Sequence, residues 1–163
     1  MDSPKVSVII PAYNAEKTVE RTIRSVLASS IPLDVWIVDD GSTDGTGDVL
    51  DRIGEEVKVR GEGEQWNSKN LFVIHQPNCG AYQARLNVLK QIRTPWFGFV
   101  DADDTIEPTM FEKMLAFAEC ERLDVVRCSY DGAADLGLTD CGIDGLSDCR
   151  GVAGTRQAVF EIY

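Results

Sequence analysis

Four short apolar runs, separated by helix-like segments, place the strongest constraint on how this chain can fold. They are "VSVII" (6–10), "DVWIV" (34–38), "LFVIH" (71–75) and "FGFV" (97–100). Runs of this length, rich in β-branched and aromatic residues, are typical of strands that are covered on both faces of a parallel sheet. Strands that alternate with helices predict an α/β fold with a mostly parallel sheet flanked by helices.

The segments between these runs predict helices and loops. Asn14 is the expected N-cap of the first helix, whose apolar stripe includes Val19, Ile23, Val26 and Leu27. Further helices are expected at 49–53, 80–92, 108–122 and 155–163, and one more strand at 124–130. Polar, glycine-containing composition predicts a surface loop at 54–70 and another at 131–151.

Polar residues follow each strand-like run. They are Tyr13 and Asn14, Asp39 and Asp40, Asn78, and the acidic stretch from Asp101 to Asp104. In a parallel sheet the carboxyl ends of neighbouring strands meet at one edge, where ligands bind. The sequence therefore predicts a single binding site built from four strand ends.

The acidic stretch is the densest of these clusters, with carboxylates at Asp101, Asp103 and Asp104. Mg²⁺ and Mn²⁺ prefer such oxygen ligands, and Mg²⁺ sites commonly combine one or two carboxylates with phosphate oxygens. The net charge of −11 excludes a nucleic-acid partner, which would require clustered Lys and Arg. A phosphorylated small molecule stays possible if a divalent cation bridges the charges.

Length and cysteine content fit one domain in a reducing compartment. The 163 residues are enough for a single core. No run reaches the length of a membrane span, and the N-terminus lacks the pattern of a secretory signal. The five cysteines include no Cys-x-x-Cys pair, so free thiols in the cytoplasm are expected, with any membrane association provided by other regions or partners.

Two short motifs suggest alternatives. "DDGSTDGTGDVL" carries Gly45 and Gly47 but has Leu50 where a dinucleotide fingerprint needs its third glycine, so that interpretation is set aside. "FGFVDADDTI" resembles the haloacid dehalogenase-like Mg²⁺-dependent phosphatases, in which Asp101 would be the nucleophile and Asp103 the acid/base. A catalytically inactive nucleotide-binding domain is the third alternative.

A longer resemblance includes all the polar clusters. The segments "VSVIIPAYNAEKTVERTIRSVL", "VWIVDDGSTDGT", "NCGAYQARLNVLK" and "PWFGFVDADD" strongly resemble the family 2 glycosyltransferases. The resemblance runs from about residue 5 to residue 130 and implies the GT-A fold, a Rossmann-like, mostly parallel sheet flanked by helices. It implies a metal-dependent inverting transferase that moves a sugar from a nucleoside diphosphate, expected to be UDP, to an unknown acceptor such as a cell-surface polysaccharide or a lipid-linked glycan.

The resemblance also assigns residues. The nucleotide-binding residues it implies are Pro11, Ala12, Tyr13, Asn14, Asp39, Arg85 and Asp101, and the ligands it implies for Mn²⁺ or Mg²⁺ are Asp103 and Asp104. Tyr13 would stack on the base, and Asp39 would accept the N3–H of uracil. Leu86 occupies the place of an asparagine that usually follows the arginine of this motif.

The family's general base has no match in the sequence, so the catalytic base is unassigned. Residues 1–163 are expected to form a single GT-A-type domain that ends before the acceptor-binding half. Such a domain is expected to bind a nucleotide and a metal while transferring sugar poorly by itself.

Overall fold

A computed structural model describes residues 3–60, 70–128, 149–152 and 158–162. Its strands are β1 (Val6–Ala12), β2 (Leu33–Asp40), β3 (Asn70–Gln76), β4 (Trp96–Phe99), β5 (Val125–Cys128), β6 (Cys149–Val152) and β7 (Ala158–Ile162). Its helices are α1 (Val19–Leu27), α2 (Thr46–Arg60), α3 (Ala81–Leu89) and α4 (Met110–Glu121).

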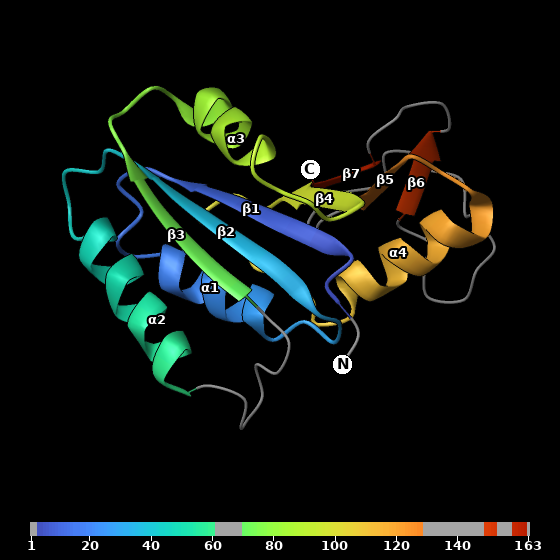
Figure 1. Cartoon of the computed structure of the whole chain (residues 1–163), viewed down its shortest axis with the longest axis horizontal. Helices are drawn as coiled ribbons and strands as arrows, with labels where there is room; N and C mark the ends of the chain where they lie inside the picture. The colour runs from blue at the N-terminus through green and yellow to red at the C-terminus, as the bar shows by residue number, and fades with distance from the viewer. Residues whose placement is uncertain (1–2, 61–69, 129–148, 153–157, 163) are drawn as a thin grey trace.

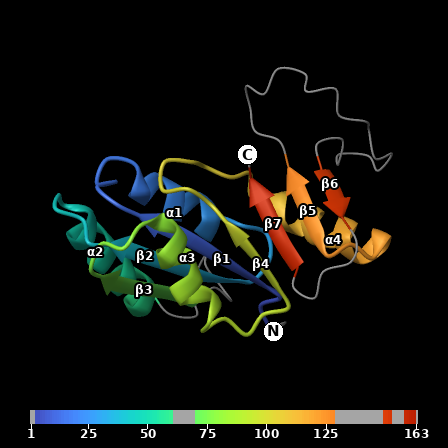
Figure 2. The same cartoon turned by 90° about the horizontal axis from the view of Figure 1, so that it is seen from above.

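All these strands form one sheet in the order β3-β2-β1-β4-β7-β5-β6. Each neighbouring pair among the described strands is parallel except β5 and β6. The predicted α/β class with a mostly parallel sheet is therefore confirmed. Helix α3 lies on one face of the sheet and α1 and α2 on the other (Figure 1), while β5 and β6 lie beside α4 at the end of the molecule away from α2 (Figure 2).

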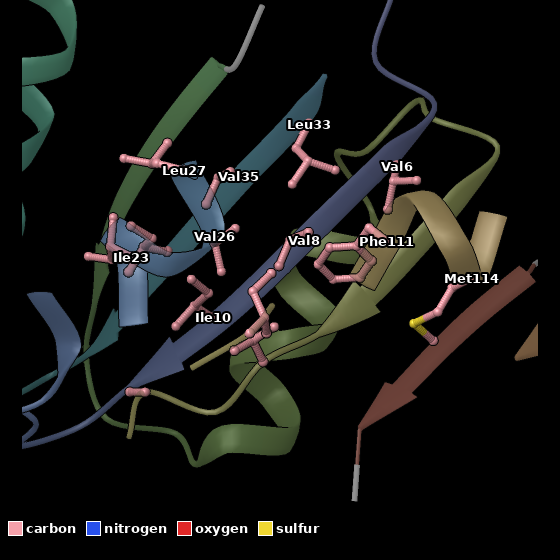
Figure 3. Packing of buried hydrophobic residues seen from close by; sticks show 14 of the residues in the cluster. Val6, Val8, Ile10, Ile23, Val26, Leu27, Leu33, Val35, Phe111 and Met114 are labelled. Carbon is pink, nitrogen blue, oxygen red and sulfur yellow. The ribbon is translucent and has the colours of Figure 1, made fainter. Parts of the chain in front are cut away.

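Strand β1 is the centre of two hydrophobic clusters because its side chains alternate between the two faces of the sheet. Val6, Val8 and Ile10 are fully buried in the larger cluster, together with residues of α1 and α4 (Figure 3). The same cluster includes residues of α2. Ile9 belongs to the smaller cluster, which includes Ala84 and other residues of α3. Both faces of β1 are therefore covered, as its uninterrupted apolar run predicts.

Four local predictions are wrong. Helix α2 continues to Arg60 instead of giving way to a loop after Ile53. Residues 149–152 form β6 within a predicted loop, and residues 158–162 form β7 where a helix is expected. Asn14 does not cap α1, which begins at Val19. Residues 61–69 and 131–148 of the predicted loops lie outside the described residues.

Gly54 lies inside α2, and its replacement by alanine is expected to stabilise the fold. Alanine favours a helix interior over glycine by about 1 kcal/mol. A Cβ at this position would lie 3.5 Å from Val73 Cγ2, an ordinary van der Waals contact. We expect Gly54→Ala to raise the free energy of unfolding by about 1 kcal/mol in a denaturant titration. A lower free energy of unfolding would show that the added methyl group does not fit between α2 and β3.

Candidate functional site

The carboxyl ends of the parallel strands meet at one edge of the sheet. Ala12 of β1 pairs with Asp39 of β2, and Asp39 pairs in turn with His75 of β3. Beside these ends is a cavity of about 390 Å³ between the end of β1, the start of α3 and the acidic stretch after β4. Its lining consists of Pro11, Tyr13, Asn14, Ala15, Thr18, Ala81, Arg85, Asp101, Ala102 and Asp103.

The cavity gathers six of the nine residues that the sequence assigns to nucleotide or metal. Pro11, Tyr13, Asn14, Arg85, Asp101 and Asp103 line it, whereas Ala12, Asp39 and Asp104 do not. Tyr13 is 52% exposed, so its ring is available to a ligand. Asp39 is 7% exposed and pairs with Ala12, the neighbour of Tyr13 in sequence. Asp104 is exposed in the acidic stretch next to Asp103.

Two loops beside the cavity, 13–18 after β1 and 41–46 after β2 (the latter ending with Thr46, the first residue of α2), are joined by reciprocal hydrogen bonds. The Thr43 N–H donates to Asn14 Oδ1 at 2.8 Å, and the Asn14 N–H donates to Ser42 Oγ at 3.0 Å. The Ala15 N–H donates to Thr46 Oγ1 at 2.8 Å. Asn14 adopts the left-handed conformation with φ of 50°, which asparagine tolerates better than most residues. Asn14 therefore joins the two loops instead of capping a helix.

Asp39 is a nearly buried carboxylate with two protein donors. The Ser42 N–H donates to Oδ1 at 3.0 Å, and His75 Nδ1 lies 3.0 Å from Oδ2. Burial by itself raises the pKa of Asp39, but the hydrogen bonds from Ser42 and His75 outweigh it and hold that pKa below its ordinary value. Asp39 is thus an anion at neutral pH, although water reaches little of it.

Asp40 organises the loop between β3 and α3. Its carboxylate accepts hydrogen bonds from Gln76 Nε2 at 2.7 Å, from the Cys79 N–H at 3.0 Å and from the Gly80 N–H at 2.7 Å. A buried carboxylate with three donors is well satisfied and also favours the positive end of a helix dipole. Asp40 therefore holds the start of α3, and with it Arg85, beside the cavity.

Arg85 and Asp101 form an ion pair at the cavity. Arg85 Nη2 lies 2.6 Å from Asp101 Oδ1, and the guanidinium lies over the Phe99 ring at 5.3 Å from its centroid. Asp101 remains 60% exposed. A guanidinium carries five N–H donors, and among them the buried Nε of Arg85 has no hydrogen-bond partner in the described part of the chain.

Helix α1 holds the acidic stretch through three side chains. Thr22 Oγ1 donates to the Ala102 carbonyl at 3.0 Å, and Arg21 Nη2 donates to the Asp103 carbonyl at 2.9 Å. The Ile106 N–H donates to Ser25 Oγ at 3.2 Å. The sequence did not predict these contacts, because the partners lie 80 to 82 positions apart in the chain.

Replacing Thr22 by valine tests this attachment. Thr22 is fully buried, so valine keeps the shape of the side chain and leaves the Ala102 carbonyl without its donor. We expect Thr22→Val to lower the free energy of unfolding by about 1–3 kcal/mol in a urea titration. Thr22→Ser keeps the hydroxyl and is expected to lose less. A valine variant that equals the wild type would show that the hydrogen bond to Ala102 contributes nothing.

The sequence profile described as "Glycosyl transferase family 2" matches residues 7–137, most of the chain. The chain belongs to this family. The predicted resemblance is therefore confirmed, and it favours the glycosyltransferase interpretation over the phosphatase alternative. All the residues that line the cavity lie within 7–137, so the match covers the whole candidate site.

Two known proteins are similar to this part of the chain. The "Uncharacterized glycosyltransferase EpsJ" of Bacillus subtilis (strain 168) is 33% identical over 129 residues, which cover 78% of this chain and 34% of EpsJ. The crystal structure of S. aureus TarS 1-349 in complex with UDP-GlcNAc superposes with a TM-score of 0.62 at 31% identity, over 78% of this chain and 36% of that one.

A third match concerns the fold. The mannosyltransferase PcManGT from Pyrobaculum calidifontis, in complex with GDP-Man and Mn²⁺, has a TM-score of 0.66 at 20% identity, over 79% of this chain and 36% of that one. These likenesses confirm the GT-A fold. This family 2 chain spans about a third of the length of the three proteins.

The acidic stretch of this family 2 chain has the chemistry of a partial metal site. Partial desolvation raises the pKa of the exposed Asp104 above its ordinary value, and the charges of Asp103 and Asp101 raise it further, with Arg21 opposing them. Negative charge is therefore in excess, and a cation would relieve it. No set of three His, Cys, Asp or Glu in the described ranges could hold a metal ion unaided. Carboxylates here fit Mn²⁺ or Mg²⁺ only as part of a shared ligand set.

None of the helices in the described part of the chain is long and apolar enough to cross a membrane.

Proposed function

We propose that this domain binds the donor of an inverting glycosyl transfer, a UDP-sugar together with Mn²⁺ or Mg²⁺. The single observation that carries the proposal is the cavity of about 390 Å³ that Tyr13, Arg85, Asp101 and Asp103 line together. An aromatic ring, a guanidinium and two carboxylates are the groups that a base, a diphosphate and its metal require. TarS, a relative at 31% identity, has been solved with UDP-GlcNAc, which supports UDP as the nucleotide.

The nucleoside would be bound at the carboxyl ends of β1 and β2. The half-exposed ring of Tyr13 offers a stacking surface, and stacking of a base on an aromatic ring contributes about 1–3 kcal/mol in single-strand binders. Pro11, Ala12 and Asn14 supply the surrounding main chain. Asp39 is the proposed acceptor of the uracil N3–H, and Asp101 the proposed partner of the ribose.

The diphosphate would be bound at the other side of the cavity. Arg85 already contacts a carboxylate, Asp101, and could donate from its remaining N–H groups to phosphate oxygens. Asp103 and Asp104 would hold the metal, with the phosphates completing its ligand set. When bound, the metal supplies Lewis-acid stabilisation of the leaving diphosphate. The fold likeness to PcManGT, solved with GDP-Man and Mn²⁺, is consistent with this arrangement.

The acceptor is proposed to be a hydroxyl of a cell-surface polysaccharide or of a lipid-linked glycan. Cys79 and Cys120 are free thiols, which suits the reducing cytoplasm as the proposed location. We predict that residues 1–163 bind the donor and that other parts of the protein bind the acceptor.

The decisive experiment is calorimetric titration of UDP into the protein, once with Mn²⁺ and once with EDTA. We expect binding with the metal and a loss of most of it with EDTA. The same titration with ADP and GDP identifies the base preference. Absence of binding for all three nucleotides in the presence of Mn²⁺ would overturn the proposal. Phosphatase activity that requires Mg²⁺ and Asp101 would instead support the alternative.

A further inference from the structure

The chain's single histidine lies between two carboxylates at the edge of the site. His75 is on β3, and its Nδ1 is 3.0 Å from Oδ2 of Asp39 on β2. Its other ring nitrogen, Nε2, is 3.1 Å from Oδ1 of Asp51 on α2. His75 thereby connects three elements, although nothing in the sequence indicates a partner for it.

The two carboxylates hold the imidazole differently. Asp39 is nearly buried, whereas the Asp51 side chain is 70% exposed and can also be solvated by water. A neutral imidazole has only one N–H, so it can donate to one carboxylate at a time. The hydrogen bond to Asp39 raises the pKa of His75 above its ordinary value, with burial opposing and Asp51 adding to the rise. The geometry therefore favours an N–H on each ring nitrogen.

The bridge determines the direction of the Asp39 carboxylate. A carboxylate offers about four acceptor positions on its two oxygens. The Ser42 N–H occupies one on Oδ1 and His75 one on Oδ2, so both oxygens are held in place. Gly47, in the first turn of α2, lies next to this pair, and a Cβ there would make ordinary van der Waals contacts with Asp39 Oδ2 at 3.4 Å and His75 Cε1 at 3.7 Å.

We propose that His75 is a positioning residue for base recognition, and that through Asp39 it selects a nucleobase with an N–H donor at the ring position facing that carboxylate. The inference rests on the proposed function, because Asp39 has to be a base contact. His75 itself need not touch the nucleotide. It holds the acceptor in one orientation before the base arrives, which lowers the free-energy cost of ordering that acceptor on binding.

Two isosteric substitutions separate the two contacts of His75. In His75→Asn the amide nitrogen can occupy the place of Nδ1 and keep the donor to Asp39 while the contact to Asp51 is lost. In His75→Gln the amide nitrogen can occupy the place of Nε2, so the contact to Asp51 is kept and the donor to Asp39 is lost. A charge-assisted hydrogen bond contributes about 1.5–3 kcal/mol, and a factor of ten in affinity corresponds to about 1.4 kcal/mol.

The readout is the ratio of the affinities for UDP and CDP, measured by calorimetry with Mg²⁺. Cytosine has a lone pair at N3 where uracil has an N–H, while the ribose, the diphosphate and the metal are common to both. We expect wild type and His75→Asn to prefer UDP to a similar degree. We expect His75→Gln to lose about tenfold in UDP affinity and most of the preference. If the role of His75 were purely structural, its replacement would lower the affinities for UDP and CDP equally. Thermal unfolding of both variants checks for a loss of stability.

A spectroscopic measurement uses the unchanged protein. Because the chain has one histidine, ¹⁵N-histidine labelling gives a single set of imidazole signals, which need no assignment by mutation. We expect the Nδ1 signal to shift when Mg²⁺ and UDP are added.

Each outcome decides between the two proposals. UDP binding that leaves the imidazole signals unchanged, or equal UDP/CDP ratios in His75→Asn and His75→Gln, would overturn the role of His75 while leaving the donor site intact. Failure of the wild type to bind any nucleotide with a metal would overturn the proposed function, and the role of His75 with it.

Discussion

Asp103→Asn is expected to abolish the metal-dependent part of UDP binding. The substitution keeps the shape of the side chain and removes the negative charge that a divalent cation needs. Loss of an outer-shell partner commonly lowers metal affinity 10–100-fold, so loss of a direct ligand is expected to exceed about 100-fold. The quantity to measure is the difference between UDP affinities with Mn²⁺ and with EDTA, which should approach zero in the variant.

Glu107→Gln is the matched control for Asp103→Asn. Glu107 is exposed just beyond the same acidic stretch, and its replacement by an amide removes one negative charge in the same way. We expect this variant to retain the metal-dependent increment, that is, the difference between its UDP affinities with Mn²⁺ and with EDTA. If both substitutions reduce it equally, the effect is one of general charge, and Asp103 is not a metal ligand. If Asp103→Asn retains the increment, the assignment of the ligand is wrong.

Gly41→Ala is expected to be the most damaging small substitution next to the site. Gly41 has φ of 72°, a left-handed conformation that costs an alanine about 1–2 kcal/mol. A Cβ there would also lie 2.6 Å from the main-chain nitrogen of Asn78, an approach that real Cβ atoms do not make. Main chain cannot rotate away as a flexible side chain can, so the loop after β2 and the loop after β3 would have to separate.

We expect Gly41→Ala to lower the free energy of unfolding by about 2–4 kcal/mol, the strain plus the usual cost of overpacking. The measurement is a denaturant titration beside Gly54→Ala, the same chemical change with the opposite expected sign. UDP binding should weaken too, since Gly41 precedes Ser42, whose N–H is held by Asp39. A variant as stable as the wild type would contradict the close approach of the two loops.

The central strands and the order of elements could be predicted because their information is local. The apolar run at 6–10 needs only its own composition to be recognised as a strand covered on both faces. Helix α2 was predicted too short because Gly54 looks like a helix end, although Val57 continues the buried stripe one turn after Ile53. Residues 158–162 pair with β4 and β5, and such distant pairing overrides local helix preference.

The candidate site shows the same difference between features with local sequence signals and features that depend on distant residues. Its polar clusters could be recognised because each directly follows a strand, and parallel strands end at a common edge. The supports of the site could not be recognised. The bonds from Thr22 to the Ala102 carbonyl, and from His75 to Asp39 and Asp51, join residues 80, 36 and 24 positions apart. Sequence motifs thus indicated most of the groups that line the cavity and missed the groups that hold them.

The hydrogen bonds that join loop 13–18 to loop 41–46 have a consequence for the thermodynamics of binding. Main-chain donors of each loop are already paired with side chains of the other. The two loops beside Tyr13 are therefore ordered before a ligand binds. Binding coupled to folding would show a large negative heat-capacity change from newly buried chain. For this protein we expect a small heat-capacity change on binding, set by the surface of the nucleotide alone, because the two loops are already joined before the ligand binds.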